Sequence, residues 1–340
     1  MEWDEKRFLL GIDAGATKTH YALYDRKKRT LEVLTGGPAN HESLAGGFSE
    51  LETVLKEQVG ALLGRCGIRV QQVDGAGFGM AGVDTRRQHA IVSDIFRRLG
   101  LSRFEMANDA SLGIWATCPD GAGVCAVNGS GFSVYAMDGA GGEAQIGGLG
   151  DLTGDKGGGG YLTDKAVAGV YASLYKGGPE TAMTGPMFAS LGIARKEEFV
   201  EALSNGLYGS GNARALRRDI SRILHQAAAQ GDTIARDILI SSGQEYAAAI
   251  LGAVNELPLL RRSALQIVLV GSVFNKGECP LAIDTLAGEV TNAMQPVGCV
   301  FHRLTAPPVL GALQWAQKTA GLPPMNADEK QYLIGKMTGM

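Results

Sequence analysis

An α/β fold in two domains is the architecture that this sequence predicts. With 340 residues, the chain exceeds the size at which a single core usually stops growing. Short apolar strands alternate with segments of helical periodicity, as is typical of α/β sheets. Strand, glycine-rich turn and strand follow one another at 8–24 and again at 124–137, which indicates two halves of related topology. We expect one domain over residues 1–118 and another over 119–340.

The first predicted domain opens with an antiparallel meander, and a mostly parallel α/β segment extends its sheet. The basic run at 26–29 lies where the second turn of the meander is expected, so a solvated turn is favoured over a binding patch. The predicted strands are 8–12, 21–24, 31–34, 73–78 and 104–107, and the predicted helices are 43–63 and 85–99.

The second predicted domain opens with strands at 124–127 and 134–137. Helices are expected to dominate residues 160–256 as an insertion, and the apolar run at 265–270 predicts a buried strand. The last predicted elements are a helix from about Pro280, a strand near Val300 and a helix from about Pro308, which is a candidate to pack back on the first domain.

Composition narrows the classes of partner. Hydrophobic residues make up 45% and charged residues 20% of the chain, which suits a folded protein with a sizeable core. The formal net charge of -3 gives no attraction for nucleic acid or anionic membranes. No apolar run is long enough to span a membrane, so we expect a cytoplasmic protein. The five cysteines are scattered without a Cys-x-x-Cys pair, which favours free thiols.

The small, polar segment from Asp13 to Thr19 is the first candidate phosphate-binding turn. A glycine at position 15 lets a phosphate approach the backbone closely, because no Cβ stands in the way. Thr17 can donate its hydroxyl to a phosphate oxygen, and Lys18 lies in the same turn. Asp13, at the end of the strand, can hold Mg²⁺ through water. An ordinary hairpin would show a similar pattern.

A second candidate turn, Gly129-Ser130-Gly131, also lies between apolar strands. Two such turns, one from each domain, would clasp a polyphosphate without the lysine-containing P-loop that the chain lacks. Gly271 and Ser272, after the buried strand, supply a third close backbone approach, near a nucleoside.

The order of these motifs, with Asp109 between the two turns, resembles the N-acetylglucosamine kinases of the BadF/BadG/BcrA/BcrD ATPase family, in the actin/Hsp70/hexokinase superfamily. The resemblance runs from Leu9 to about Trp315. It implies two ribonuclease-H-like, actin-like ATPase domains around an interdomain cleft, with Thr17 and Ser130 facing one triphosphate. It also implies transfer of the γ-phosphate of ATP, with Mg²⁺, to the 6-hydroxyl of N-acetylglucosamine, and a homodimer.

The same resemblance implies roles for the remaining site residues. Asp109 would be the general base that takes the proton of the sugar hydroxyl; the alternative is an N-cap for the helix that starts near Ala110. Asn40 would contact the sugar, where the residues alone favour a turn asparagine. The loop at 147–157 would hold the hexose, and its sugar-binding residues are Gly148, Leu149, Gly150 and Asp155.

Four positions depart from the family pattern. An aromatic residue is missing at Leu149, and Lys156 replaces an acidic residue. Phe132 stands where a small polar residue is usual, and Ser130 stands where threonine is common. The missing aromatic residue in the sugar-binding loop weakens stacking on a sugar face. N-acetylmuramic acid and glucosamine therefore stay alternative acceptors.

Two other classes of protein compete with a kinase. Some BadF-like proteins are ATPase activators of acyl-CoA dehydratases or reductases that carry an iron–sulfur cluster, but no cysteine pair here resembles theirs. A sugar-sensing regulator is the other class, and the sequence shows no N-terminal helix-turn-helix pattern.

Overall fold

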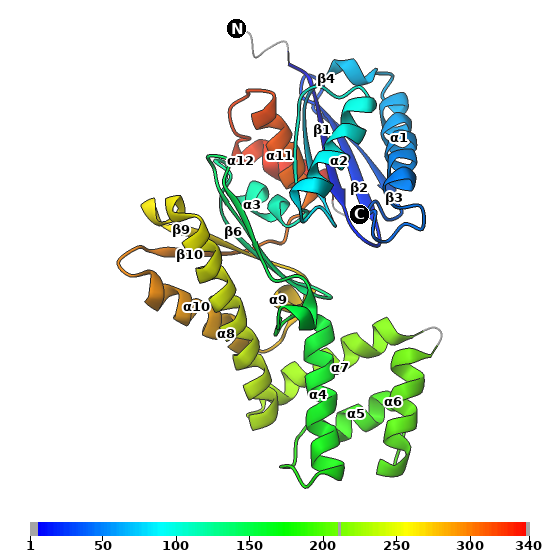
Figure 1. Cartoon of the computed structure of the whole chain (residues 1–340), viewed down its shortest axis with the longest axis vertical. Coiled ribbons are helices and arrows are strands. Elements are labelled where there is room, and N and C mark those ends of the chain that lie inside the picture. Colours follow the sequence, from blue (N-terminus) through cyan, green and yellow to red (C-terminus); the bar gives the residue numbers. More distant parts are fainter. Residues whose placement is uncertain (1–5, 210–211, 338–340) are drawn as a thin grey trace. The chain divides into compact units, whose positions relative to one another are not determined.

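The computed structural model describes residues 6–209 and 212–337, and these form two compact units (Figure 1). Of the described residues, the first unit comprises 6–125, 136–143 and 304–337, and the second comprises 126–135, 144–209 and 212–303. The chain therefore passes between the two units four times. The predicted boundary at 118/119 stays a prediction.

The sheet of the first unit combines a meander with a parallel extension. Among the described residues it has five strands in the order β3-β2-β1-β4-β5. β1 pairs antiparallel with β2, and β2 with β3, while β4 and β5 continue the sheet parallel to β1. The strands are β1 Phe8–Ala14, β2 Thr19–Asp25, β3 Thr30–Gly36, β4 Val73–Met80 and β5 Phe104–Ala107. The predicted meander and its parallel extension are confirmed.

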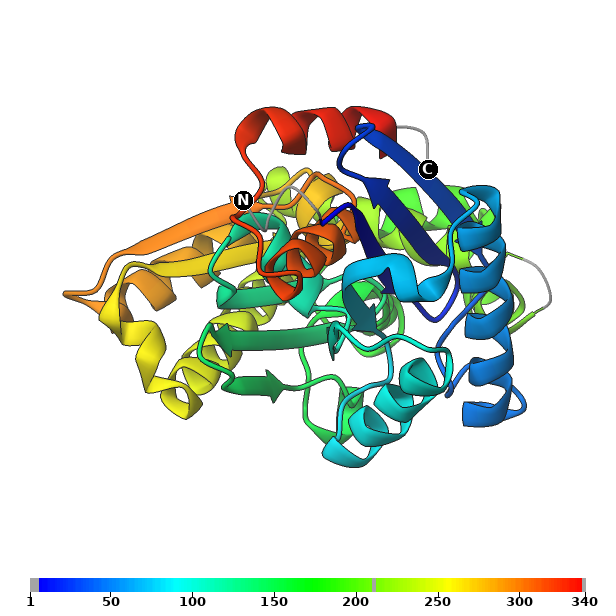
Figure 2. The same cartoon turned by 90° about the horizontal axis from the view of Figure 1, so that it is seen from above.

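Helices pack on both faces of this sheet. α1 and α2 share one hydrophobic core with the side chains of one sheet face, while α11 packs against β1 and β4. α12 lies beside β3 (Figure 2). The Tyr332 hydroxyl of α12 donates to the carbonyl of Arg29, just before β3. The helices are α1 Gly47–Arg65, α2 Arg86–Arg98, α3 Ser111–Thr117, α11 Val309–Thr319 and α12 Ala327–Met337, with a 3₁₀ turn at Val70–Gln72.

Alternating glycines in β4 make room for α11. Side chains of a strand point to opposite faces in turn, so Ala76 and Phe78 enter the core with α1 and α2, while Gly75 and Gly77 face α11. A Cβ at Gly77 would lie 2.4 Å from the carbonyl oxygen of Ala312. The helix backbone therefore rests directly on the strand.

The second unit repeats this strand order. Among the described residues its five-stranded sheet runs β10-β9-β6-β7-β8, so the strands, counted from β6 in sequence, have the same order as in the first sheet. β9 and β10 are parallel. The strands are β6 Ala122–Asn128, β7 Phe132–Asp138, β8 Glu143–Ile146, β9 Leu265–Val270 and β10 Cys299–Arg303. The two halves predicted from the sequence thus share a topology.

Helices fill most of the second unit between β8 and β9. A hydrophobic cluster joins α4, α5, α6, α7 and α8, and α10 packs along α8. The helices are α4 Gly158–Tyr175, α5 Thr184–Leu191, α6 Phe199–Tyr208, α7 Ala213–Ala229, α8 Thr233–Glu256, α9 Ser272–Lys276 and α10 Leu281–Met294, with 3₁₀ turns at Gly150–Leu152, Lys196–Glu198 and Pro258–Arg262. In the described parts of the chain, no helix has the length and apolar character needed to cross a membrane.

Some boundaries differ from the sequence predictions. The helix expected from Ser43 starts at Gly47, after a turn in which the Ser43 amide donates to the Asn40 carbonyl. β8, α9 and α12 were not predicted, and the helix from Pro308 is therefore not the last element. Each missed element is short or has few buried apolar residues, so its periodicity is weak.

Replacing Gly77 with alanine tests the contact between β4 and α11. The added methyl group has no space, so we expect Gly77→Ala to lower the free energy of unfolding by about 1–3 kcal/mol. The matched control is Gly60→Ala on α1, where nothing lies within 4 Å and alanine should stabilise the helix by about 0.5–1 kcal/mol. Denaturant titration measures both, and a neutral Gly77→Ala would contradict the close approach.

Candidate functional site

Polar residues gather where the parallel strands of the first sheet end. Asp13 of β1 is aligned with Gly79 of β4, which is aligned with Ala107 of β5. The residues that follow these strands, including Asp84 and Asp109, therefore meet at one edge. The carboxyl ends of parallel strands are where α/β proteins commonly bind ligands.

The turn between β1 and β2 is tight and exposed. The Gly15 amide donates to the Lys18 carbonyl at 3.1 Å, and a Cβ at Gly15 would lie 2.8 Å from that oxygen. Thr17 and Lys18 are exposed, so the hydroxyl and the ammonium group can reach a ligand. Asp13 is half-buried, and its Oδ2 lies 3.5 Å from Nδ1 of the buried His20.

Asn40 is buried beside the same edge. Its side-chain oxygen accepts from the Glu42 amide at 2.8 Å, and a Cβ at Gly82 would lie 2.4 Å from that oxygen. The turn asparagine that the residues alone favoured is therefore present. Because the oxygen is used within the loop, the Nδ2 hydrogens are what Asn40 can offer a ligand.

Asn108 organises the loop that carries Asp109. Its Nδ2 donates to Asp84 Oδ1 at 2.7 Å, and its Oδ1 accepts from the Ala110 amide at 2.9 Å. The sequence reasoning gave no role to Asp84 or Asn108. The signal that could have identified Asp84 is its place in the loop between the buried strand β4 and α2.

Asp109 has an electrostatic environment that suits a base. Removal from water raises the pKa of Asp109 to about 7, and the negative charges of Asp13 and Asp84 act in the same direction. A carboxyl group with a pKa near neutrality can exchange a proton at physiological pH. α3 starts at Ser111, so its N-cap residue is Ala110 and not Asp109. The N-cap residue makes no side-chain hydrogen bond to the helix.

In the second unit, three glycine segments meet at the β6–β7 turn. The amides of Gly159 and Gly160 donate to the carbonyls of Gly129 and Ser130, at 2.8 and 3.1 Å. The Gly158 amide donates to Asn128 Oδ1 at 3.0 Å. These first-turn amides of α4 are therefore used within the protein, whereas Ser130 and Gly131 themselves are exposed.

Gly271 is the third glycine segment at the β6–β7 turn. Its φ of 108° lies in the region that favours glycine, and a Cβ there would lie 2.3 Å from the Asn128 carbonyl oxygen. Ser272 follows as the first residue of α9 and is exposed.

The loop at 147–157 is held together by Asp155. Its Oδ2 accepts from the amides of Gly148 and Gly150, both at 2.9 Å, and its Oδ1 accepts from the Thr153 hydroxyl at 2.8 Å. Asp155 is buried, so the carboxylate shapes the loop from inside. Leu149, between the two amides, is 66% exposed.

Two of the residues that depart from the family pattern, Phe132 and Lys156, contact other side chains. Phe132 is buried under the loop, where its ring packs on Tyr246 with the centroids 4.3 Å apart. Cβ atoms at Gly147 and Gly157 would lie within 2.5 and 2.6 Å of that ring, so the loop rests on it. Lys156 Nζ lies 3.8 Å from Glu245 Oε2.

The proposed site residues thus form one group in each unit. Asp13, Gly15, Thr17, Lys18, Asn40 and Asp109 belong to the first, and residues 129–131, 148–150, 155 and 271–272 belong to the second. That Thr17 and Ser130 face one triphosphate stays a prediction.

Comparison with known proteins gives a consistent picture. The model of the BadF/BadG/BcrA/BcrD ATPase family matches residues 10–316. An N-acetylmuramic acid/N-acetylglucosamine kinase of Clostridium acetobutylicum is 26% identical over 270 residues, which cover 79% of this chain and 86% of that protein.

Solved structures share the fold. A proposed N-acetylglucosamine kinase of Chromobacterium violaceum has a TM-score of 0.61 at 18% identity, over 92% of this chain and 100% of that one. A ROK family glucokinase from Streptomyces griseus, in complex with glucose and AMPPNP, has a TM-score of 0.53 at 17% identity, over 92% of this chain and 99% of that one. The predicted actin-like ATPase fold class is therefore confirmed.

Removing the Asp155 carboxylate should loosen the loop. In Asp155→Ala the amides of Gly148 and Gly150 lose their acceptor, so we expect faster hydrogen–deuterium exchange at both. Asp151→Ala is the control, since Asp151 is an exposed carboxylate of the same loop. Unchanged exchange at Gly148 and Gly150 in the first variant would show that other contacts hold the loop.

Proposed function

The chain belongs to the BadF/BadG/BcrA/BcrD ATPase family, and we propose that it is an ATP-dependent kinase of an amino sugar. The observation that carries this proposal is Asp109, a carboxyl group with a pKa of about 7 at an edge that also bears Asp13 and the turn with Thr17. Similarity to an N-acetylmuramic acid/N-acetylglucosamine kinase over 79% of the chain supports an amino sugar as the acceptor.

In the proposed reaction Asp109 acts as the general base. Its carboxylate takes the proton of a sugar hydroxyl as that oxygen attacks the γ-phosphorus of ATP; the new bond is O–P, and ADP leaves with the electrons of the broken bond. Asn108 holds the Asp109 loop through the Ala110 amide and Asp84. Positioning of this kind matters because phosphoryl transfer depends mainly on alignment and charge stabilisation.

The phosphates of ATP would contact the two glycine-rich turns. Thr17 and Lys18 would bind them from the first unit, and Gly129, Ser130 and Gly131 from the second, where Gly271 and Ser272 would approach the nucleoside. The exposure of Thr17, Lys18, Ser130 and Gly131 supports these roles.

Asp13 would hold Mg²⁺, directly or through water. The Asp13 carboxylate is half-buried at the end of β1 and supplies the kind of oxygen ligand that this ion prefers. No three acidic, His or Cys side chains of the described residues could hold an ion together, so the phosphates of ATP and water would supply the other ligands. When bound, Mg²⁺ would neutralise charge on the β- and γ-phosphate oxygens.

The acceptor sugar would contact Asn40 and the loop of Gly148, Leu149 and Gly150. Because the Asp155 oxygens already accept three hydrogen bonds within the loop, we assign Asp155 mainly the task of shaping that loop for the sugar. N-acetylglucosamine, phosphorylated at the 6-hydroxyl, is the proposed acceptor. N-acetylmuramic acid is the second candidate, since a similar kinase is named for both sugars.

A coupled assay of ADP release tests the proposal. We expect turnover with N-acetylglucosamine or N-acetylmuramic acid, and less with glucosamine or glucose; mass spectrometry identifies the phosphorylated product. Asp109→Ala should bind ATP but lose at least about two orders of magnitude in kcat, since a base contributes about 10²–10⁴-fold. Asp94→Asn, a surface carboxylate on α2, is the control. ADP release that no sugar stimulates would refute the proposal.

Activity should depend on pH through Asp109. Only the carboxylate form accepts a proton, so kcat/KM should be maximal above its pKa and fall as the pH drops below about 7. Asp84→Asn removes a negative charge that raises this pKa, so the acidic limb should move to lower pH. A limb that stays in place would show that Asp84 does not act on Asp109.

A further inference from the structure

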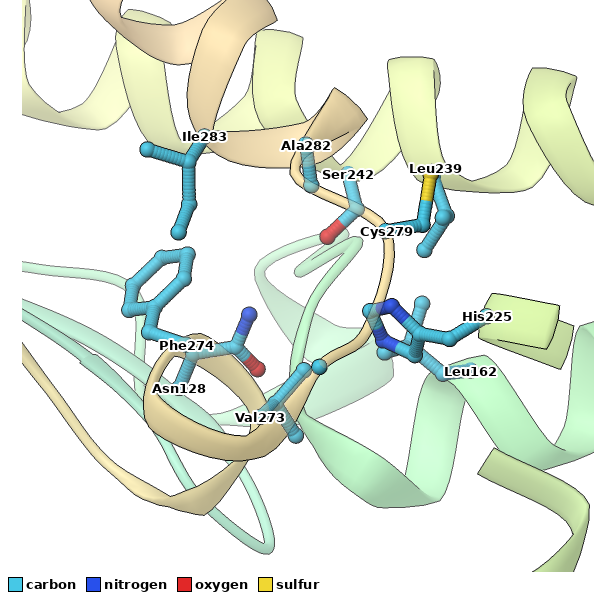
Figure 3. A pocket seen from close by; sticks show the side chains of 11 residues that line it. Asn128, Leu162, His225, Leu239, Ser242, Val273, Phe274, Cys279, Ala282 and Ile283 are labelled. Atoms are coloured by element: carbon cyan, nitrogen blue, oxygen red, sulfur yellow. The ribbon is translucent and has the colours of Figure 1, made fainter. Parts of the chain in front are cut away.

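A small polar cavity lies in the second unit behind the β6–β7 turn, where four buried atoms lack a hydrogen-bond partner among the described residues. They are Asn128 Nδ2, both ring nitrogens of His225, and Ser242 Oγ. In Figure 3 the amide of Asn128 and the hydroxyl of Ser242 point into the same space, with the His225 ring beside it. Buried polar groups are almost always paired with protein or water.

Rotation of the Asn128 amide cannot supply the missing hydrogen-bond partner. Its Oδ1 accepts from the Gly158 amide at 3.0 Å, so the Nδ2 group must face the cavity. Leu162, Val273 and Phe274 supply much of the remaining wall and offer no acceptor. The His225 ring and the Ser242 hydroxyl also line the cavity, but neither forms a hydrogen bond with Nδ2, so the acceptor for Nδ2 must be a molecule within the cavity.

The other two residues complement Asn128 chemically. Burial lowers the pKa of His225 although the Cys279 backbone and the charge of Glu278 act in the opposite direction, and a neutral ring offers one donor and one acceptor. The hydroxyl of Ser242 can donate or accept. A single molecule that both donates and accepts could therefore bond to all three side chains.

The cavity volume, about 10 Å³, is close to the least that holds one water molecule. We propose that this cavity is a binding site for one ordered water molecule, which accepts from Asn128 and bonds to His225 and Ser242. Three hydrogen bonds are typical of a buried water. The water thereby links α7 and α8 to Asn128, the residue just before the Gly129-Ser130-Gly131 turn.

A high-resolution crystal structure of the whole chain tests the site directly. We expect density for one water within about 2.7–3.2 Å of at least two of the three side chains. A cavity without density would overturn the proposal.

Thermal unfolding of Ser242→Ala tests the site in solution. The direction in which Tm changes distinguishes a cavity that holds water from one that does not. If water is bound, the variant loses a hydrogen bond, and its Tm should fall by about 2–4 °C. If the cavity is dry, the variant loses an unpaired hydroxyl, and its Tm should stay or rise. Ser241→Ala, the neighbouring partly exposed position on α8, is the control.

One further readout rests on the proposed function. If the water holds Asn128 behind a phosphate-binding turn, Ser242→Ala should raise KM for ATP several-fold and leave KM for the sugar unchanged. An unchanged KM for ATP would overturn the link to the turn. The density and the Tm decide the water site even if no sugar is phosphorylated.

Discussion

Both units depend on places where two stretches of backbone come closer than a side chain would allow. In the first, Gly75 and Gly77 let α11 rest on β4. In the second, Gly158 and Gly271 bring the start of α4 and the end of β9 against the β6–β7 turn; a Cβ at Gly158 would lie 2.5 Å from the Gly131 carbonyl carbon. Glycine costs backbone entropy, and its use here is explained by the packing that it permits.

The side-chain carboxyl groups at the end of the first sheet lower the stability of the folded state at neutral pH. A carboxyl group whose pKa is raised on folding binds its proton more tightly in the folded state, so its contribution to stability falls as the pH rises from about 4 to about 7. Asp109 is such a group, and Asp13 and Asp84 add to the effect. Asn108 offsets part of this cost by bonding to Asp84 and to the Ala110 amide. Functional sites are commonly less stable for this reason, which agrees with the role proposed for Asp109.

The loop at 147–157 shows how departures from a family pattern can be absorbed. Phe132 replaces a small polar residue but lies beneath the loop and packs against Tyr246, so it supports the backbone. Lys156 has Glu245 as a partner. Leu149 is 66% exposed and lies between the Gly148 and Gly150 amides of the loop, so it bears most directly on which sugar the proposed kinase accepts.

The sequence by itself determined most of the strands and their glycine-rich turns, because short apolar runs and the glycines between them are local signals. It also determined the family, through the order of Asp13, Asp109 and the two turns along the chain. Only the tertiary structure decided that Asp84 joins Asp109, that Asp155 bonds within its loop, and that Asn128, His225 and Ser242 surround one cavity. Some of these contacts join residues that are far apart in sequence, and others depend on the direction in which a side chain points. The local pattern of apolar residues specifies neither the long-range contacts nor the side-chain directions.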